Sequence, residues 1–391
     1  MQAILYLCPA LMDWMVFFVP FAVFYAAGVR GVGMRECGWL AILCQAAYMT
    51  SSAVSGHVIT HRNARRVLLA STLICGISSV GVLCSIAFGR LAIGFLVFGA
   101  STACFFNSFQ AFMRGEASIG SLKASVALYT LSWCLGAALG NVTAGWLYQW
   151  GLSALILAVV VTTAVITFML ARPVKRPMDG DPVDAPVEQG TRPEYPVSNA
   201  YITMGWLMIF TVTCVQRPLF TFLPPMFAAE GVNSLWASLP LFMHMAVSAF
   251  FGLAMFRFRD FLYRRTPSVI IQCGGVGALC AMWIWPTYWV CFSMLCLLGI
   301  YAGFVYYCAV YYSSNSGRRC FNIGVNEALV GFGSIAGIVL VDGWMRHGGS
   351  AIAMYPICGA GLAVSISAQL VILYAKRTTG WRPRDTATSC T

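Results

Sequence analysis

Ionisable side chains stand inside long apolar stretches of this sequence at Asp13, Arg217, Glu327 and His244. A charge held in hydrocarbon costs at least about 2.5 kcal/mol on insertion scales, so such a residue must face a cavity or a partner. A carboxyl group that moves between buried and hydrated surroundings can bind and release a proton, and a guanidinium binds anions through its planar fork. Asp13 and Glu327 are therefore candidates for proton exchange, and Arg217 is a candidate for binding a substrate anion.

Each of these residues also has a structural interpretation. Asp13 could hydrogen-bond to neighbouring backbone, and Arg217 could extend towards the membrane surface. We expect His244 to be a packed, hydrogen-bonded histidine rather than a proton relay. The helical rise places Asp13 and Arg217 about 13 Å and about 24 Å from the starts of their segments, which argues against a tight ion pair.

A second group of candidates consists of amides and phenols. Asn107 and Gln110 are spaced i, i+3, and Tyr307 and Tyr311 are spaced i, i+4, so each pair lies on one face of a helix. Amides on one wall and phenols on the other could form a substrate-binding surface. The alternative is hydrogen bonding between helices.

The elements that must hold these side chains are membrane-spanning helices. Of the 391 residues, 59% are hydrophobic and 9% are charged, against roughly 25% charged in ordinary soluble domains. A span needs about 20 apolar residues, and the sequence contains twelve such runs. They cover residues 4–28, 38–58, 67–88, 91–113, 127–148, 152–171, 201–223, 235–256, 268–285, 288–312, 323–343 and 351–374.

One long polar stretch divides the twelve runs into six and six. Residues 172–199 are rich in Pro, Asp, Glu and Arg, a composition that neither crosses a membrane nor builds a core. We therefore predict an all-α membrane protein of two six-helix bundles. The expected regions are a first bundle (1–171), a cytoplasmic linker (172–200), a second bundle (201–375) and a cytoplasmic tail (376–391).

The basic residues predict which side of the membrane each loop occupies. Most of the 24 lysines and arginines fall in one set of loops, together with both termini and the linker. Of the remainder, Arg30, Arg35, Arg90 and Arg346 fall in the opposite loops. Because basic loops stay in the cytoplasm, we expect a multi-pass protein of the plasma (inner) membrane with both termini cytoplasmic. The net charge of +11 then reflects topology and not nucleic-acid binding.

The two halves of the sequence resemble each other. Residues 99–113 align with 299–313, and residues 135–146 align with 332–343. In the second alignment Gly136 and Gly140 match Gly333 and Gly337, so each half contains a pair of glycines four residues apart. An internal repeat of six helices is typical of alternating-access carriers.

The loop between the second and third runs, GHVITHRNARRVLL (56–69), is strongly basic. It resembles the loop G-x-L-x-D-R-x-G-R-R-x-x-L of the major facilitator superfamily. Gly56, Arg65 and Leu68 fit that pattern in register, whereas Thr60 replaces its usual acid. The glycine-rich fifth run also resembles that of family exporters, with Asn141 where proline is frequent.

This resemblance covers the whole chain and implies a secondary active transporter that moves a small solute by alternating access. In the family, the first, fourth, seventh and tenth spans line the cavity, which would place Asp13 and Arg217 there. The basic loop would act as a gate when Arg65 or Arg66 meets an acid or a helix C-terminus. Glu116 is the nearby acidic candidate, and Gly56 belongs to the same gate. The alternative is that the arginines serve topology alone.

Several other functions are disfavoured by the sequence. It contains no GxxxxGK[ST], HExxH or GxSxG motif, so neither nucleotide drive nor an enzyme is expected. The 16 cysteines are scattered in apolar runs, so we expect no disulfide, metal or other cofactor. The expected partners are a small-molecule solute, the lipid bilayer and protons, with a monomeric chain. A receptor or scaffold on a carrier fold and a facilitative uniporter stay open as alternatives, as does the class of solute.

Overall fold

The protein is a bundle of twelve long helices in a computed structural model that describes residues 6–59, 63–116, 122–172, 199–258, 261–314 and 319–375. All twelve are long and apolar enough to cross a membrane, and these ranges contain no strand. This confirms the twelve predicted spans. The helices are α2 (Leu7–Val29), α3 (Met34–Val58), α4 (Ala64–Leu83), α5 (Phe88–Glu116), α6 (Leu122–Tyr148), α7 (Leu152–Ala171), α8 (Asn199–Ala229), α9 (Ser234–Ala254), α10 (Arg265–Ile284), α11 (Tyr288–Ser314), α12 (Arg319–Arg346) and α13 (Met354–Ala375), with a short 3-10 turn η2 (Ala351–Ala353) before the last.

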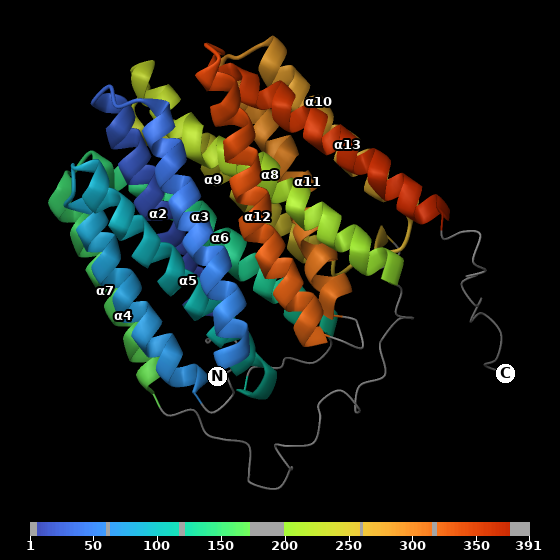
Figure 1. Cartoon of the computed structure of the whole chain (residues 1–391), viewed down its shortest axis with the longest axis horizontal. Coiled ribbons are helices and arrows are strands. Elements are labelled where there is room, and N and C mark those ends of the chain that lie inside the picture. The colour runs from blue at the N-terminus through green and yellow to red at the C-terminus, as the bar shows by residue number, and fades with distance from the viewer. Residues whose placement is uncertain are drawn as a thin grey trace, which may run out of the picture.

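The helices form two bundles that lie side by side, α2–α7 and α8–α13 (Figure 1). The packing inside one bundle repeats in the other: α2 packs on α6 as α8 packs on α12, and α4 packs on α7 as α10 packs on α13. Across the interface, α6 contacts α9, α3 contacts α12, and α2 contacts α8. Among the spans α8 and α2 are the most buried and α7 the least, so α2 and α8 form the centre of the molecule.

The paired glycines explain the close packing inside each bundle. A Cβ atom on Gly136 or Gly140 would collide with the α2 backbone at Ala10 and Trp14. A Cβ atom on the matching glycines of α12, Gly333 and Gly337, would collide with the α8 backbone at Phe210 and Cys214. The contacted residues are related by the same offset of 200 positions. The predicted repeat is therefore a structural repeat.

Helix α8 is longer than predicted. The predicted span ends at residue 223, before a pair of prolines, but α8 continues to Ala229 and includes Pro224 and Pro225. Prolines are tolerated in membrane helices when neighbouring elements accommodate the interrupted bonding. Gly28 of α2 leaves room for this part of α8, because a Cβ atom there would lie 2.6 Å from the Cα atom of Pro225.

The helices end at two opposite faces of the molecule. The linker face holds the end of α7 at Ala171 and the start of α8 at Asn199, towards the bottom of Figure 1. The opposite face holds the turn between α2 and α3, from Val29 to Met34.

Candidate functional site

The centre of the molecule lies where α2 and α8 meet. The register of the repeat, Ala10 with Phe210 and Trp14 with Cys214, makes Phe17 and Arg217 corresponding residues. These two side chains meet, with the Arg217 guanidinium carbon 5.5 Å from the centre of the Phe17 ring. Corresponding residues meet only near the axis that relates the two bundles, so Arg217 lies on the interface between them.

A small cavity of about 40 Å³ adjoins Arg217. Its wall is mainly apolar, with six phenylalanines, and draws on both bundles. The lining residues are Val16, Phe17, Pro20, Phe21 and Phe24 of α2, Ala41, Cys44 and Gln45 of α3, Phe95 and Phe98 of α5, Asn141 of α6, and Arg217, Phe220 and Thr221 of α8.

Three charged residues gather at this centre from α2, α8 and α12. Arg217 and Glu327 are both close enough to Asp13 for their charges to act on its carboxyl group. Asp13 is buried, and Arg217 and Glu327 are half-buried. Within the described ranges no ion pair joins Asp13 to Arg217, as their predicted difference in depth suggested. The sequence-predicted ionisable residues are thus brought together without a direct Asp13–Arg217 bond.

Glu327 also connects the two bundles. The Tyr48 hydroxyl of α3 donates a hydrogen bond of 2.9 Å to the Glu327 carboxylate of α12. Gly331, one turn further along α12, packs against Met49 of α3. This bond therefore joins the two bundles directly.

A buried hydrogen-bonded chain lies beside Arg217 in the second bundle. The Tyr306 hydroxyl donates to the side-chain oxygen of Gln216, whose amide nitrogen lies 2.5 Å from Nε2 of His244. Nδ1 of His244 lies 3.1 Å from the carbonyl of Leu295. A carbonyl only accepts, so Nδ1 carries the proton and Nε2 accepts from Gln216. Trp133 of the first bundle packs edge-on against Tyr306, with ring centres 4.5 Å apart.

This geometry places His244 in a packed network, the role that the sequence favoured. The network also contains Gln216, which was not predicted from the sequence, and Gln45 in the cavity wall was likewise not predicted. Gln216 directly precedes Arg217. A polar residue next to an intramembrane cation is a signal that could have been followed.

Of the amides and phenols predicted to bind a solute, the described side chains of Asn107, Tyr307 and Tyr311 do not line this cavity. The Asn107 amide donates to the Ser52 carbonyl at 3.0 Å and to the Ser55 hydroxyl at 2.6 Å, which ties α5 to α3. Tyr307 and Tyr311 are fully buried and stack in parallel with ring centres 6.1 Å apart. The Asn107 bonds correspond to the interhelical alternative, whereas the stack of Tyr307 on Tyr311 lies within α11. The side chain of Gln110 lies outside the described residues.

The predicted gate residue Arg65 contacts a helix C-terminus on the linker face. It donates to three successive carbonyls at the end of α7: Leu170 at 3.0 Å, Ala171 at 2.8 Å and Arg172 at 2.8 Å. Its counterpart in the second bundle, Arg265, donates to the Leu373 carbonyl of α13 at 3.0 Å. These contacts each lie within one bundle.

The other gate candidates are less informative. Arg66 is exposed. The surroundings of Gly56 and the side chain of Glu116 lie outside the described part of the structure. Whether these residues gate transport stays a prediction.

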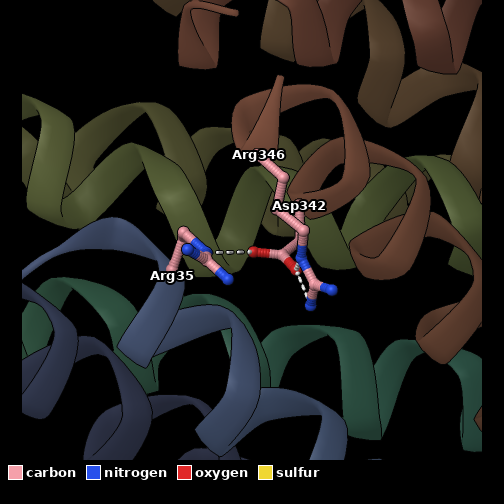
Figure 2. Close-up of polar contacts among 3 residues, drawn as sticks. All are labelled: Arg35, Asp342 and Arg346. Carbon is pink, nitrogen blue, oxygen red and sulfur yellow. Dashed lines mark hydrogen bonds and ion pairs between the residues drawn. The ribbon is translucent and has the colours of Figure 1, made fainter. Parts of the chain in front are cut away.

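A second charged cluster, not predicted from the sequence, joins the two bundles at the opposite face (Figure 2). Asp342 of α12 accepts from Arg346 at 2.6 and 2.8 Å and pairs with Arg35 of α3 at 3.4 Å. The Arg346 guanidinium also lies 5.6 Å from the ring centre of Trp39. We call Arg35, Asp342 and Arg346 the outer cluster. It borders a surface hollow of about 860 Å³ that includes Arg35 and Glu230.

The comparisons with known proteins agree with this architecture. The crystal structure of a bacterial homolog of the human lysosomal transporter Spinster, in an inward-facing and unoccupied conformation, is similar over 98% of this chain and 99% of that chain. The TM-score is 0.64 and the sequence identity is 13%, so the likeness concerns the fold. No curated protein sequence matches the chain. The sequence pattern of the Major Facilitator Superfamily matches residues 3–338, and the chain therefore belongs to this family of membrane transporters.

Proposed function

We propose that this protein is a secondary active transporter that carries a small solute by alternating access, with the charged centre at Arg217 as its binding site. The observation that carries the proposal is the position of Arg217. It is a cation deep in the membrane, at the interface of the two bundles, beside a cavity to which both contribute. Intramembrane charges that face such cavities mark solute and proton pathways.

Alternating access requires contacts between the bundles that can break on one face at a time. At the opposite face the outer cluster joins α3 to α12. Nearby, Tyr25 donates to the Val232 carbonyl at 2.7 Å, and Gln149 donates to Asn233 at 2.7 Å. These polar contacts are consistent with a state in which this face is closed. We propose that it faces away from the cytoplasm, because the basic loops lie at the linker face.

We further propose that a proton gradient drives accumulation. Asp13 is a buried carboxyl group of the central helix α2, next to Arg217 and Glu327. Opening the centre on either face admits water to Asp13. A carboxyl group that alternates between buried and hydrated surroundings exchanges its proton as it does so. Glu327 is the second candidate, because its bond to Tyr48 joins the two bundles.

Distances between spin labels test alternating access without knowledge of the solute. One pair would be placed at Val32 and Ser350, exposed on the opposite face, and one at Val58 and Arg257, exposed on the linker face. The exposed native cysteines Cys84 and Cys273 would be replaced by serine.

In lipid nanodiscs at acidic and neutral pH we expect two populations in which one distance lengthens as the other shortens. Single, invariant distances for both pairs would contradict alternating access and favour a receptor or scaffold.

A further inference from the structure

We propose that the cavity beside Arg217 binds an organic anion with an apolar, preferably aromatic, body. This inference rests on the proposed function and adds the chemical class of the solute. It is argued from the charge, the wall and the size of the cavity.

Charge selects an anion. Arg217 is the one charged residue in the wall of this cavity; Asp13 and Glu327 do not line it. Within the described part of the chain, the Arg217 guanidinium forms no hydrogen bond and no ion pair; the Phe17 ring centre lies 5.5 Å away, and Asp13 is close enough for the two charges to interact. A guanidinium presents five donors in a rigid fork that matches a carboxylate. An unpaired guanidinium at membrane depth is therefore a site for a ligand that supplies the missing acceptor.

The rest of the wall selects an apolar body. Phenylalanines of three helices surround the space next to Arg217: Phe21 and Phe24 of α2, Phe95 and Phe98 of α5, and Phe220 of α8. Aromatic side chains favour edge-to-face or offset contacts with another ring. Few polar groups accompany them, and a small inorganic anion would leave this aromatic surface without a partner.

The neighbouring acids link binding to protonation. An anion at Arg217 lies close to Asp13, whose carboxyl group already feels the charge of Glu327. Three negative charges around one cation repel, so a bound anion favours the protonated form of an acid beside it. The anion and a proton would then be carried in the same direction.

The small size of the cavity indicates that this conformation is one in which no solute is bound. A space of about 40 Å³ is far smaller than the roughly 300–1,000 Å³ of typical small-molecule sites. An organic anion enters only after the two bundles separate. Because the wall draws on α2 and α5 of one bundle and α8 of the other, such separation widens it.

Three probes of nearly equal shape and different charge test the proposal: 4-phenylbutyrate, 4-phenylbutanamide and 4-phenylbutylamine. Binding to the purified full chain would be measured as a shift in melting temperature, and uptake would be measured in proteoliposomes. We expect 4-phenylbutyrate alone to stabilise the wild-type protein. Arg217→Met should weaken its binding at least tenfold, and Arg217→Lys should weaken it less. Arg90→Met, which removes an exposed arginine of α5, is the matched control and should bind as wild type does.

The outcomes separate the two proposals. Equal binding of the amide, preferred binding of the amine, binding of no probe, or wild-type binding in Arg217→Met would each overturn the anion site. Uptake of the amine without the anion would also overturn it, while leaving transport itself supported. Binding of 4-phenylbutyrate without uptake would leave the site standing and contradict the proposed transport.

Discussion

Charged residues of the two bundles meet at two places, and their arrangements differ. In the outer cluster Asp342 lies between Arg35 and Arg346, with ion-pair distances of 3.4 and 2.6 Å. At the centre, Asp13 and Arg217 influence each other but form no ion pair within the described residues. Asp342 near the surface is ion-paired, whereas Asp13 and Arg217 at the centre are not.

This difference indicates different roles. The side chains of Arg35 and Arg346 are 53% and 45% exposed, so solvent supports their charges and their ion pairs are weak and reversible. Such contacts suit a closure that must open in every cycle. At the centre Asp13 is buried and Arg217 is half-buried, and within the described residues neither forms an ion pair, which is unfavourable for charges at membrane depth. We infer that this unfavourable arrangement persists because a solute and a proton complete it.

The largest expected effect follows from removing the central acid. Asp13→Asn cannot release a proton, so accumulation driven by a pH gradient should be lost, whereas exchange of solute across the membrane should persist. Uptake and exchange of radiolabelled 4-phenylbutyrate in proteoliposomes measure both. Glu327→Gln, which keeps an acceptor for Tyr48, should retain part of the accumulation.

Uptake by the wild-type protein could contradict this prediction. Downhill uptake that does not respond to the proton gradient even without the substitution would make the protein a facilitative uniporter. Asp13 would then be a structural residue.

An intermediate effect is expected from the outer cluster. Asp342→Asn removes the charge between two arginines and should weaken closure of the opposite face by about 1 kcal/mol, or roughly fivefold in the ratio of closed to open states. The spin-label pair at Val32 and Ser350 reports this shift as a larger population at the longer distance. Glu36→Gln, an exposed acid of the same surface hollow, serves as the control. An unchanged distribution in Asp342→Asn would show that the cluster does not contribute to closure.

The smallest expected effects concern the linker face, where in each bundle an arginine donates to the carbonyls at the end of a helix. Arg65→Ala leaves three carbonyls of α7 without their donor and should lower the free energy of unfolding by about 1–2 kcal/mol. Arg265→Ala, at the α13 carbonyl of Leu373, should have a smaller effect. Thermal denaturation in one detergent compares them, with exposed Arg66 replaced by alanine as the control. Slower transport with unchanged stability in Arg65→Ala would instead favour the gate.

Much of the fold could be predicted because the relevant signals are local. Apolar length identifies a span, and glycine pairs such as Gly136 and Gly140 identify where backbones approach. The charges at Asp13, Arg217 and Glu327 stand out in any apolar run. The family arrangement of cavity-lining spans placed Asp13 and Arg217 at the cavity, but it gave no reason to expect Glu327 of the eleventh span beside them, where the structure places it.

What could not be predicted depends on helix rotation and on register between bundles. Helix α11 carries aromatic and small residues on all sides, so no apolar stripe indicates that Tyr306, and not Tyr307, contacts Gln216. One residue along a helix turns the side chain by about 100°. The pairing of Arg35 with Asp342 joins opposite ends of the sequence, and nothing in either segment specifies the other.

We propose that Arg217 forms no ion pair because it binds a ligand, whereas Asp342 forms ion pairs that hold the opposite face closed. The melting temperatures of ligand-free Arg217→Met and Asp342→Asn, measured side by side in the same detergent, test it most directly. Asp342→Asn should melt lower than wild type by about 1–2 °C, as expected for roughly 1 kcal/mol in a chain of this size. Arg217→Met should melt at or above the wild-type temperature, because it removes an uncompensated charge and the acids beside it can take up protons. A fall in Arg217→Met as large as that in Asp342→Asn would mean that Arg217 already has a stabilising partner, and would contradict the account.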